Sequence, residues 1–191
     1  EADRAPSVLD VDEALLHNVV LVDGVSKTFA MTGWRIGYSY CSTALATRFS
    51  SLQSHITSGA SSPAQYAAVA AYHDEPRVHE AVLAMLRVFS RRRERITAAL
   101  RDTLPEAHFD VPAGAFFIFL RVDQWYREHR GDSITFCNDL IENTGVALVP
   151  GAAFGDDRYA RLSFAVPEAE VLEAVRRLGE YLSVPAATLS R

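Results

Sequence analysis

Hydrophobic and polar residues follow two rhythms along the chain, one typical of short strands and one of amphipathic helices. A short apolar run, Val19 to Val22, is bounded by Asn18 and by Asp23-Gly24, which suits a buried parallel strand. Residues 36–41 have the pattern of a second short strand. Residues 42–58 place their large apolar side chains at spacings of four, three and four, which predicts a helix.

A long amphipathic helix is predicted from Glu80 to Leu104. Its apolar side chains share one stripe, and Pro105 ends it. At ~1.5 Å per residue, a helix of this length spans on the order of 37 Å. A helix that long usually bridges two bodies or packs across a whole domain. The stripe consists of Val82, Met85, Phe89, Ile96, Leu100 and Leu104.

The remainder of the chain alternates between strand and helix patterns. This alternation predicts a second α/β unit. A Ser61-Ser62-Pro63 sequence also begins a helix before the long one. The predicted strands are 115–120, 146–149 and 161–166, the predicted helices are 134–143 and 167–182, and a loose tail is predicted over 185–191.

Composition and charge exclude several classes of protein. The chain has 191 residues, of which 49% are hydrophobic and 23% charged, as in ordinary globular domains. A net charge of −5 disfavours a nucleic-acid partner, and no apolar run is long enough to cross a membrane. Two cysteines, Cys41 and Cys137, suit a reducing compartment, so we expect a cytoplasmic protein. The six histidines show no metal-ligand spacing, so we expect no metal.

The most informative chemistry lies in residues 26–38, which read Ser-Lys-Thr-Phe-Ala-Met-Thr-Gly-Trp-Arg-Ile-Gly-Tyr. Lys27 can form an imine with an aldehyde, and Arg35 can clamp a phosphate with two parallel hydrogen bonds. Small and apolar neighbours predict a partly dry pocket, which lowers a lysine pKa. A turn at Thr32-Gly33 is needed to bring the two cations near one ligand. The segment lacks the glycines of a P-loop and of a nucleophile elbow, and the serine of a Ser-x-x-Lys pair.

This segment closely resembles the cofactor-lysine segment of class I aminotransferases, which are fold type I enzymes that use pyridoxal 5′-phosphate (PLP). The resemblance implies that Lys27 is the catalytic residue and holds PLP as an imine. It also implies that Arg35 binds the cofactor phosphate, with Gly33 and Gly37 giving the backbone room near the ligand. Ser26 is a weaker candidate for the phosphate, because the family's hydroxyl most often stands three residues before the lysine, where this chain has Gly24.

Three further motifs extend the resemblance over residues 19–182. Residues 112–117 are similar to the family's Gly-Ala-Phe strand, residues 149–155 to its Val-Pro-Gly-x-x-Phe-Gly turn, and residues 159–165 to its Arg-Leu-Ser-Phe/Tyr-Ala strand. The last match implies that Arg161 binds the substrate α-carboxylate. A guanidinium suits that ligand because it can form two parallel hydrogen bonds with a carboxylate.

The implied fold is α/β, specifically the C-terminal part of a fold type I PLP-dependent transferase. It would comprise the end of the large-domain sheet (1–79), a long interdomain helix (80–104) and a small α/β domain (105–191). Family members are about twice as long. Their other half carries the Asp that protonates the pyridine nitrogen and the groups that hold the ring, none of which can be assigned here. We therefore expect a C-terminal half that is a poor catalyst by itself.

The implied activity is amino transfer between an amino acid and a 2-oxo acid, in a homodimer or with a complementing N-terminal half. Three alternatives stay open. PLP-dependent lyases and other fold type I enzymes keep the same lysine and arginines. Some transcription regulators carry an aminotransferase-like effector domain. A degenerate, non-catalytic fragment is the third alternative.

Overall fold

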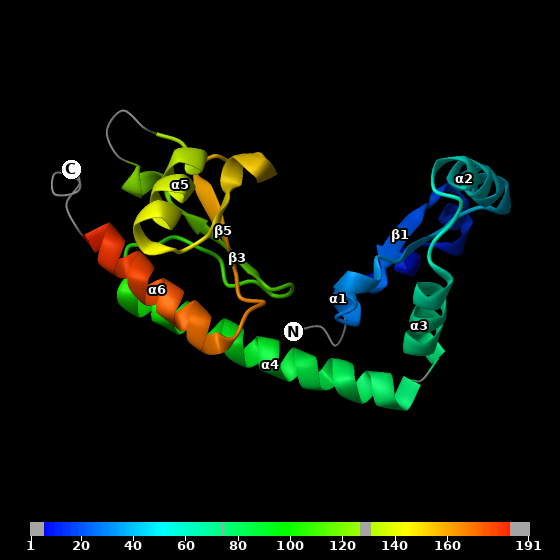
Figure 1. Cartoon of the computed structure of the whole chain (residues 1–191), viewed down its shortest axis with the longest axis horizontal. Coiled ribbons are helices and arrows are strands. Elements are labelled where there is room, and N and C mark those ends of the chain that lie inside the picture. The colour runs from blue at the N-terminus through cyan, green and yellow to red at the C-terminus, as the bar shows by residue number, and fades with distance from the viewer. Residues whose placement is uncertain (1–5, 74, 127–130, 184–191) are drawn as a thin grey trace. The chain divides into compact units, whose positions relative to one another are not determined.

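The chain divides into two compact units, Glu1–Met85 and Leu86–Arg191. The structure, a computed structural model, describes residues 6–73, 75–126 and 131–183. Each unit has its own small sheet (Figure 1). The boundary between the units falls inside the long helix α4 (Glu75–Thr103). The predicted division into 1–79, 80–104 and 105–191 stays a prediction, and the predicted tail at 185–191 lies outside the described residues.

The first unit combines a two-stranded sheet with two helices and several short turns. The predicted helices at 42–58 and after Ser61 are present, as is the second strand. In chain order the elements are η1 (Val8–Asp10), η2 (Glu13–Asn18), β1 (Leu21–Gly24), α1 (Val25–Thr28), η3 (Thr32–Trp34), β2 (Gly37–Tyr40), α2 (Thr43–Ile56) and α3 (Ser62–His73).

The prediction of a buried parallel strand at Val19 to Val22 is wrong for the described chain. β1 begins at Leu21 and pairs antiparallel with β2, and Val22 is 75% exposed. The segment between the two strands forms only α1 and η3, which is too little chain for the crossover that parallel pairing needs. The chain therefore turns back on itself, and β2 returns alongside β1.

The first unit buries very little apolar surface of its own. Among its described residues, only Val25 and Ala64 are buried hydrophobic side chains. The apolar stripe that predicts α2 is solvent-facing towards its end, where Leu52 is 58% and Ile56 is 68% exposed. Soluble monomers rarely expose large contiguous apolar patches. The first unit therefore contains many apolar side chains, but few of them are buried within it.

Helix α4 confirms the predicted long amphipathic helix, although it begins at Glu75 rather than Glu80. The predicted stripe faces inward: Ile96, Leu100 and Leu104 are buried, and the earlier members of the stripe are half-buried. The helix ends at Thr103, two residues before Pro105. A proline disfavours helical geometry in the residue before it, which accounts for this end.

The second unit is built on a three-stranded antiparallel sheet in the order β3-β5-β4. The predicted alternation of strands and helices is present, and the helices α5 and α6 pack with the C-terminal part of α4 against the sheet (Figure 1). The elements are β3 (Phe117–Arg121), η4 (Asp123–Trp125), α5 (Ser133–Thr144), β4 (Val149–Pro150), η5 (Gly151–Phe154), β5 (Tyr159–Ser163) and α6 (Glu168–Ser183).

One face of this sheet closes the core and the other is open. Ile118 and Leu120 of β3 and Leu162 of β5 point inward, where they join apolar side chains from all three helices. Successive strand residues point to opposite faces. The residues between them therefore lie on the outer face, including Phe119 and Arg161, the one candidate site residue of the second unit.

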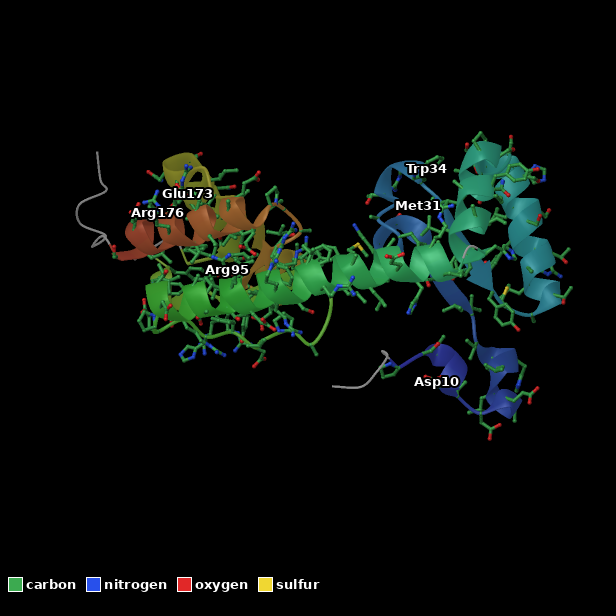
Figure 2. All side chains as sticks on the ribbon, turned by 90° about the horizontal axis from the view of Figure 1, so that it is seen from below. Asp10, Met31, Trp34, Arg95, Glu173 and Arg176 are labelled. Atoms are coloured by element: carbon green, nitrogen blue, oxygen red, sulfur yellow. The ribbon has the colours of Figure 1, made fainter. Side chains whose placement is uncertain are left out.

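The basic sequence Arg91-Arg92-Arg93-Glu94-Arg95 on α4 makes contacts within the second unit. Arg95 and Arg91 both pair with Glu168 at the start of α6, and Arg93 donates to the carbonyl of Pro112. On the far part of α6, Arg176 pairs with Glu173 at 2.7 Å (Figure 2). Exposed pairs of this kind contribute only about 0–1 kcal/mol each, so the core supplies most of the unit's stability.

Candidate functional site

The loop at residues 25–36, here called the lysine loop, carries three of the predicted site residues. Its two ends are fixed by a glycine pair, because Gly24 of β1 lies opposite Gly37 of β2. A Cβ atom on Gly24 would lie 3.0 Å from the carbonyl oxygen of Ile36, and one on Gly37 would lie 3.1 Å from that of Asp23. Gly24 and Gly37 thus allow the two strands to approach closely.

The lysine loop contains the predicted turn. Residues Thr32–Trp34 form η3, and the hydroxyl of Thr32 donates to the carbonyl of Ser26 at 3.2 Å. Arg35 follows with a left-handed backbone at φ 54°, and its Nη1 donates to the carbonyl of Thr32 at 3.1 Å. Ala30 is also left-handed, at φ 54°. Non-glycine residues in this region cost on the order of 1–3 kcal/mol each and cluster at functional sites.

Lys27 lies in α1 directly after β1, and it is the only lysine in the chain. The expectation of a dry pocket is wrong for the described residues, because Lys27 is exposed and nearby Trp34, which is labelled in Figure 2, is 48% exposed. A single loop covers only one side of a side chain.

An aromatic cluster anchors the lysine loop at both ends. Tyr72 of α3 packs edge-on against Phe29, with ring centroids 4.9 Å apart, and against Tyr38, with centroids 5.9 Å apart. The hydroxyl groups of Tyr38 and Tyr72 are 3.0 Å apart, and Tyr38 also donates to Asp23. Partial burial, and then the bond with Tyr38, raise the pKa of Tyr72. Phe29 follows Lys27 and Tyr38 follows Arg35, so α3 contacts the chain just beyond each cation.

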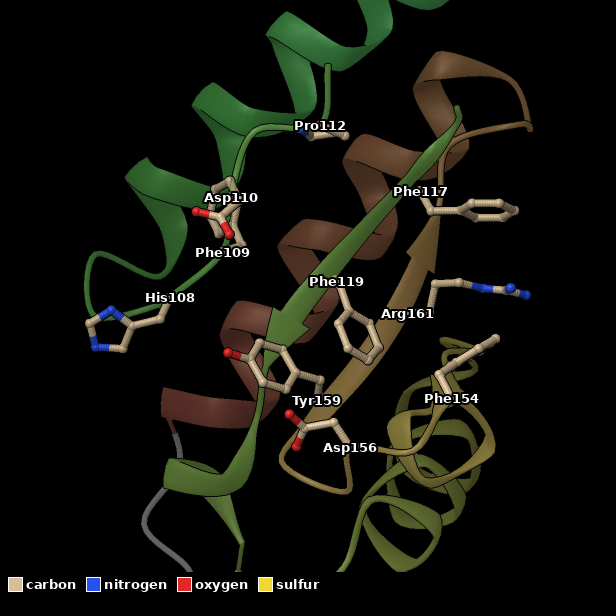
Figure 3. A pocket seen from close by; sticks show the side chains of 10 residues that line it. All are labelled: His108, Phe109, Asp110, Pro112, Phe117, Phe119, Phe154, Asp156, Tyr159 and Arg161. Atoms are coloured by element: carbon tan, nitrogen blue, oxygen red, sulfur yellow. The ribbon is translucent and has the colours of Figure 1, made fainter. Parts of the chain in front are cut away.

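Arg161 lies in the second unit, on the outer face of its sheet. In β5 it is opposite Phe119 of β3 and diagonal to Phe117. Its Cζ lies 4.2 Å from the centroid of the Phe117 ring and 4.5 Å from that of Phe154, so the guanidinium extends between two rings (Figure 3). Its Nε is buried and has no hydrogen-bond partner among the described residues.

A pocket of about 860 Å³ opens beside Arg161 (Figure 3). Asp156, an acidic residue of the pocket wall, is bound by Arg158. Two bonds from Arg158, of 2.9 and 2.6 Å, hold the pKa of this carboxyl down to about 2. Asp156 is therefore charged but already paired at neutral pH. The pocket is lined by His108, Phe109, Asp110, Pro112, Phe117, Phe119, Phe154, Asp156, Tyr159 and Arg161.

The structure thus brings Ser26, Lys27 and Arg35 together on one loop and places Arg161 in the other unit. The rings around Arg161 were missed by sequence reasoning. A signal for them existed, since Phe117 and Phe154 both belong to the motifs that carry the resemblance.

Within the described residues no group of histidine, cysteine and carboxylate side chains is arranged to hold a metal ion. Nor is any described helix both long and apolar enough to cross a membrane.

Comparison with known proteins gives consistent matches over nearly the whole chain. The aspartate aminotransferase of Thermotoga maritima is 37% identical over 181 residues, which cover 95% of this chain and 44% of that protein. The aspartate/prephenate aminotransferase of Nitrosomonas europaea is 36% identical over 95% of this chain and 46% of its own length. The chain therefore spans a little under half the length of these relatives.

Solved structures agree with the sequence matches. The crystal structure of the Thermotoga maritima protein superposes with a TM-score of 0.81 over 95% of this chain and 44% of its own. The aromatic aminotransferase of Pyrococcus horikoshii, 31% identical, gives 0.84 over 95% of this chain and 47% of its own. The predicted fold class, part of a fold type I PLP-dependent transferase, is confirmed. The family profile described as "Aminotransferase class I and II", whose members are in general PLP-dependent, matches residues 2–178. The chain belongs to the class I and II aminotransferase family.

Proposed function

We propose that this chain is part of a PLP-dependent amino acid aminotransferase, which moves an amino group between an amino acid and a 2-oxo acid. The observation that carries the proposal is the guanidinium of Arg161, which is held between two rings in the wall of a pocket. A chain of this family needs such a group to bind a substrate carboxylate. The relatives named above are all aminotransferases, which favours this activity over a lyase or a regulator's effector domain.

Lys27 is the residue that we assign to the cofactor and to proton transfer. When bound, PLP supplies an aldehyde and a ring that accepts electrons from the reacting carbon. Lys27 would hold the cofactor through its Nζ, and its free amine would act as the general base that takes the proton from the substrate α-carbon. Lys27 follows β1 directly, and its side chain is exposed, so its Nζ can be reached by a ligand.

Arg35 and Ser26 are proposed to bind the cofactor phosphate. A guanidinium has five N–H donors, and one nitrogen of Arg35 bonds to the Thr32 carbonyl. That bond orients the side chain and leaves donors for an anion. The carbonyl of Ser26 accepts from Thr32, which fixes its backbone beside Lys27. We assign its hydroxyl to the same phosphate.

The remaining walls of the site are proposed to come from chain outside this sequence, either a complementing N-terminal half or a second copy in a homodimer. Two observations support this. The chain spans 44–46% of the length of its relatives. Lys27 and much of the apolar surface of the first unit are exposed, including Val22 at 75% and Tyr66 at 76%. We place the protein in the cytoplasm, where its two free cysteines stay reduced.

A direct test uses this chain joined to the part of the Thermotoga maritima relative that lies outside the match, here called the reconstituted enzyme. We expect it to convert amino acids and 2-oxoglutarate to 2-oxo acids and glutamate. The 191-residue chain alone should give no turnover. Robust turnover by the chain alone, as a monomer, would contradict the proposed division of the site. Loss of ammonia from amino acids without amino transfer would instead indicate a lyase.

A further inference from the structure

Beyond the carboxylate role of Arg161, we propose that Phe117 and Phe154 are positioning residues that restrict Arg161 to one mode of binding, end-on to a planar carboxylate. The inference rests on the proposed function, because it takes a carboxylate as the ligand of Arg161. It concerns the two rings, which the sequence resemblance does not assign to any role. The set formed by Phe117, Arg161 and Phe154 is called the arginine stack.

The arginine stack is assembled from three separate segments. Phe117 lies on β3, Arg161 on β5, and Phe154 at the end of η5. Both rings lie well within the ~6 Å over which a cation is attracted to a ring face, at 4.2 and 4.5 Å from Cζ. Figure 3 shows the Arg161 side chain running between the two rings, with its guanidinium end pointing away from the strands. The rings therefore cover both faces of the guanidinium plane.

Covering the faces leaves only the edges of the guanidinium for a ligand. One edge, which includes Nε, is excluded because Nε is buried. The remaining edge consists of Nη1 and Nη2, which make no hydrogen bond or ion pair with the described residues. Two parallel N–H groups in one plane match the two oxygens of a carboxylate. A tetrahedral oxyanion places its third oxygen out of that plane, towards a ring.

The turn that carries Phe154 is itself held rigidly. The hydroxyl of Ser133, which is fully buried, accepts from the backbone N–H of Ala152 at 3.1 Å and donates to Asp157 at 2.6 Å. The turn ends at Gly155, whose φ of 86° is natural for glycine. Phe154 is 48% exposed. Because the backbone rather than the ring is anchored, replacing the ring should leave the fold intact.

The test uses the full 191-residue chain and the Nε–Hε NMR signal of Arg161, assigned by its loss in Arg161→Lys. Protons over ring faces are shifted upfield, so Phe154→Leu should move this signal downfield.

Titration with acetate should shift the Arg161 signal in the wild type. Methanesulfonate, an equally charged tetrahedral anion, should bind more weakly than acetate. In Phe154→Leu the acetate affinity should fall roughly 2- to 10-fold, because an arginine that is no longer held must be immobilised on binding.

Matched variants separate a positioning role from a general effect on the pocket. Phe154→Tyr should retain the signal position and the acetate affinity. Phe109→Leu removes another ring of the same pocket, one that lies over Arg101 rather than Arg161, and should change neither. Unchanged affinity and anion preference in Phe154→Leu would overturn the inference while leaving the carboxylate role of Arg161 in place. A wild-type signal that no acetate concentration shifts would overturn both.

Discussion

Arg161→Lys in the reconstituted enzyme should lower kcat/KM for amino acids by roughly 10- to 150-fold, while simple amines react about as before. Lysine keeps the positive charge but cannot form two parallel hydrogen bonds with a carboxylate. It also lacks the flat group that packs between Phe117 and Phe154. Steady-state kinetics with matched amino acids and amines would measure the difference.

Arg121→Lys is a matched control for this experiment. Arg121 lies on the same outer sheet face, but its guanidinium already bonds to Asp123 at 2.8 and 2.9 Å. Its replacement should leave the preference for amino acids unchanged. If Arg161→Lys slows amines as much as amino acids, Arg161 has a structural role and does not bind the substrate carboxylate.

Gly151→Ala should destabilise the second unit by about 3 kcal/mol or more. A Cβ atom at this buried position would lie 2.2 Å from the carbonyl oxygens of both Asp156 and Tyr159. Neither oxygen can rotate away, because both belong to the backbone. The η5 turn would have to move, and Phe154 with it.

The effect on stability can be measured by chemical denaturation in a Trp34→Phe background. Trp125 is then the sole tryptophan and reports on the second unit. Gly114→Ala serves as the control, since nothing lies within 4 Å of a Cβ atom there. Equal midpoints for the two alanine variants would show that the turn at Gly151 is not as tightly packed as the structure indicates.

The elements of the second unit were largely predictable, because each strand and helix hides one face within the same unit. The errors lie at strand ends. β5 spans Tyr159–Ser163, whereas the apolar run up to Val166 predicts 161–166. Pairing with β3 begins at Tyr159, opposite Arg121, and a hydrophobicity pattern holds no information about such partners. Likewise, Val146 and Leu148 are buried as the pattern implies, but ladder pairing starts only at Val149.

In the first unit, the hydrophobic pattern predicts the helices and strands but not which of their side chains are buried. Val22 and Ile56 sit in apolar patterns and are nevertheless 75% and 68% exposed. A hydrophobic pattern predicts that a face is buried, but it does not show whether the surface that covers this face belongs to the same chain.

The site was predictable where a local motif carries it and not where it depends on distant segments. Lys27 and Arg35 lie within one short segment whose resemblance to a family motif predicted a shared ligand. The arginine stack joins residues from β3, η5 and β5, and no local pattern links them. The status of Lys27 as the chain's only lysine was a further signal in the sequence.

The central claim, that Lys27 holds the cofactor, is tested most directly by reducing the PLP-loaded reconstituted enzyme with borohydride and mapping its peptides. The account predicts a visible absorbance band that reduction abolishes, and a reduced adduct on Lys27. The Lys27→Arg variant, which keeps the charge but cannot form the bond, should show neither. A reduced adduct on a lysine of the Thermotoga maritima part, with Lys27 unmodified, would contradict the account.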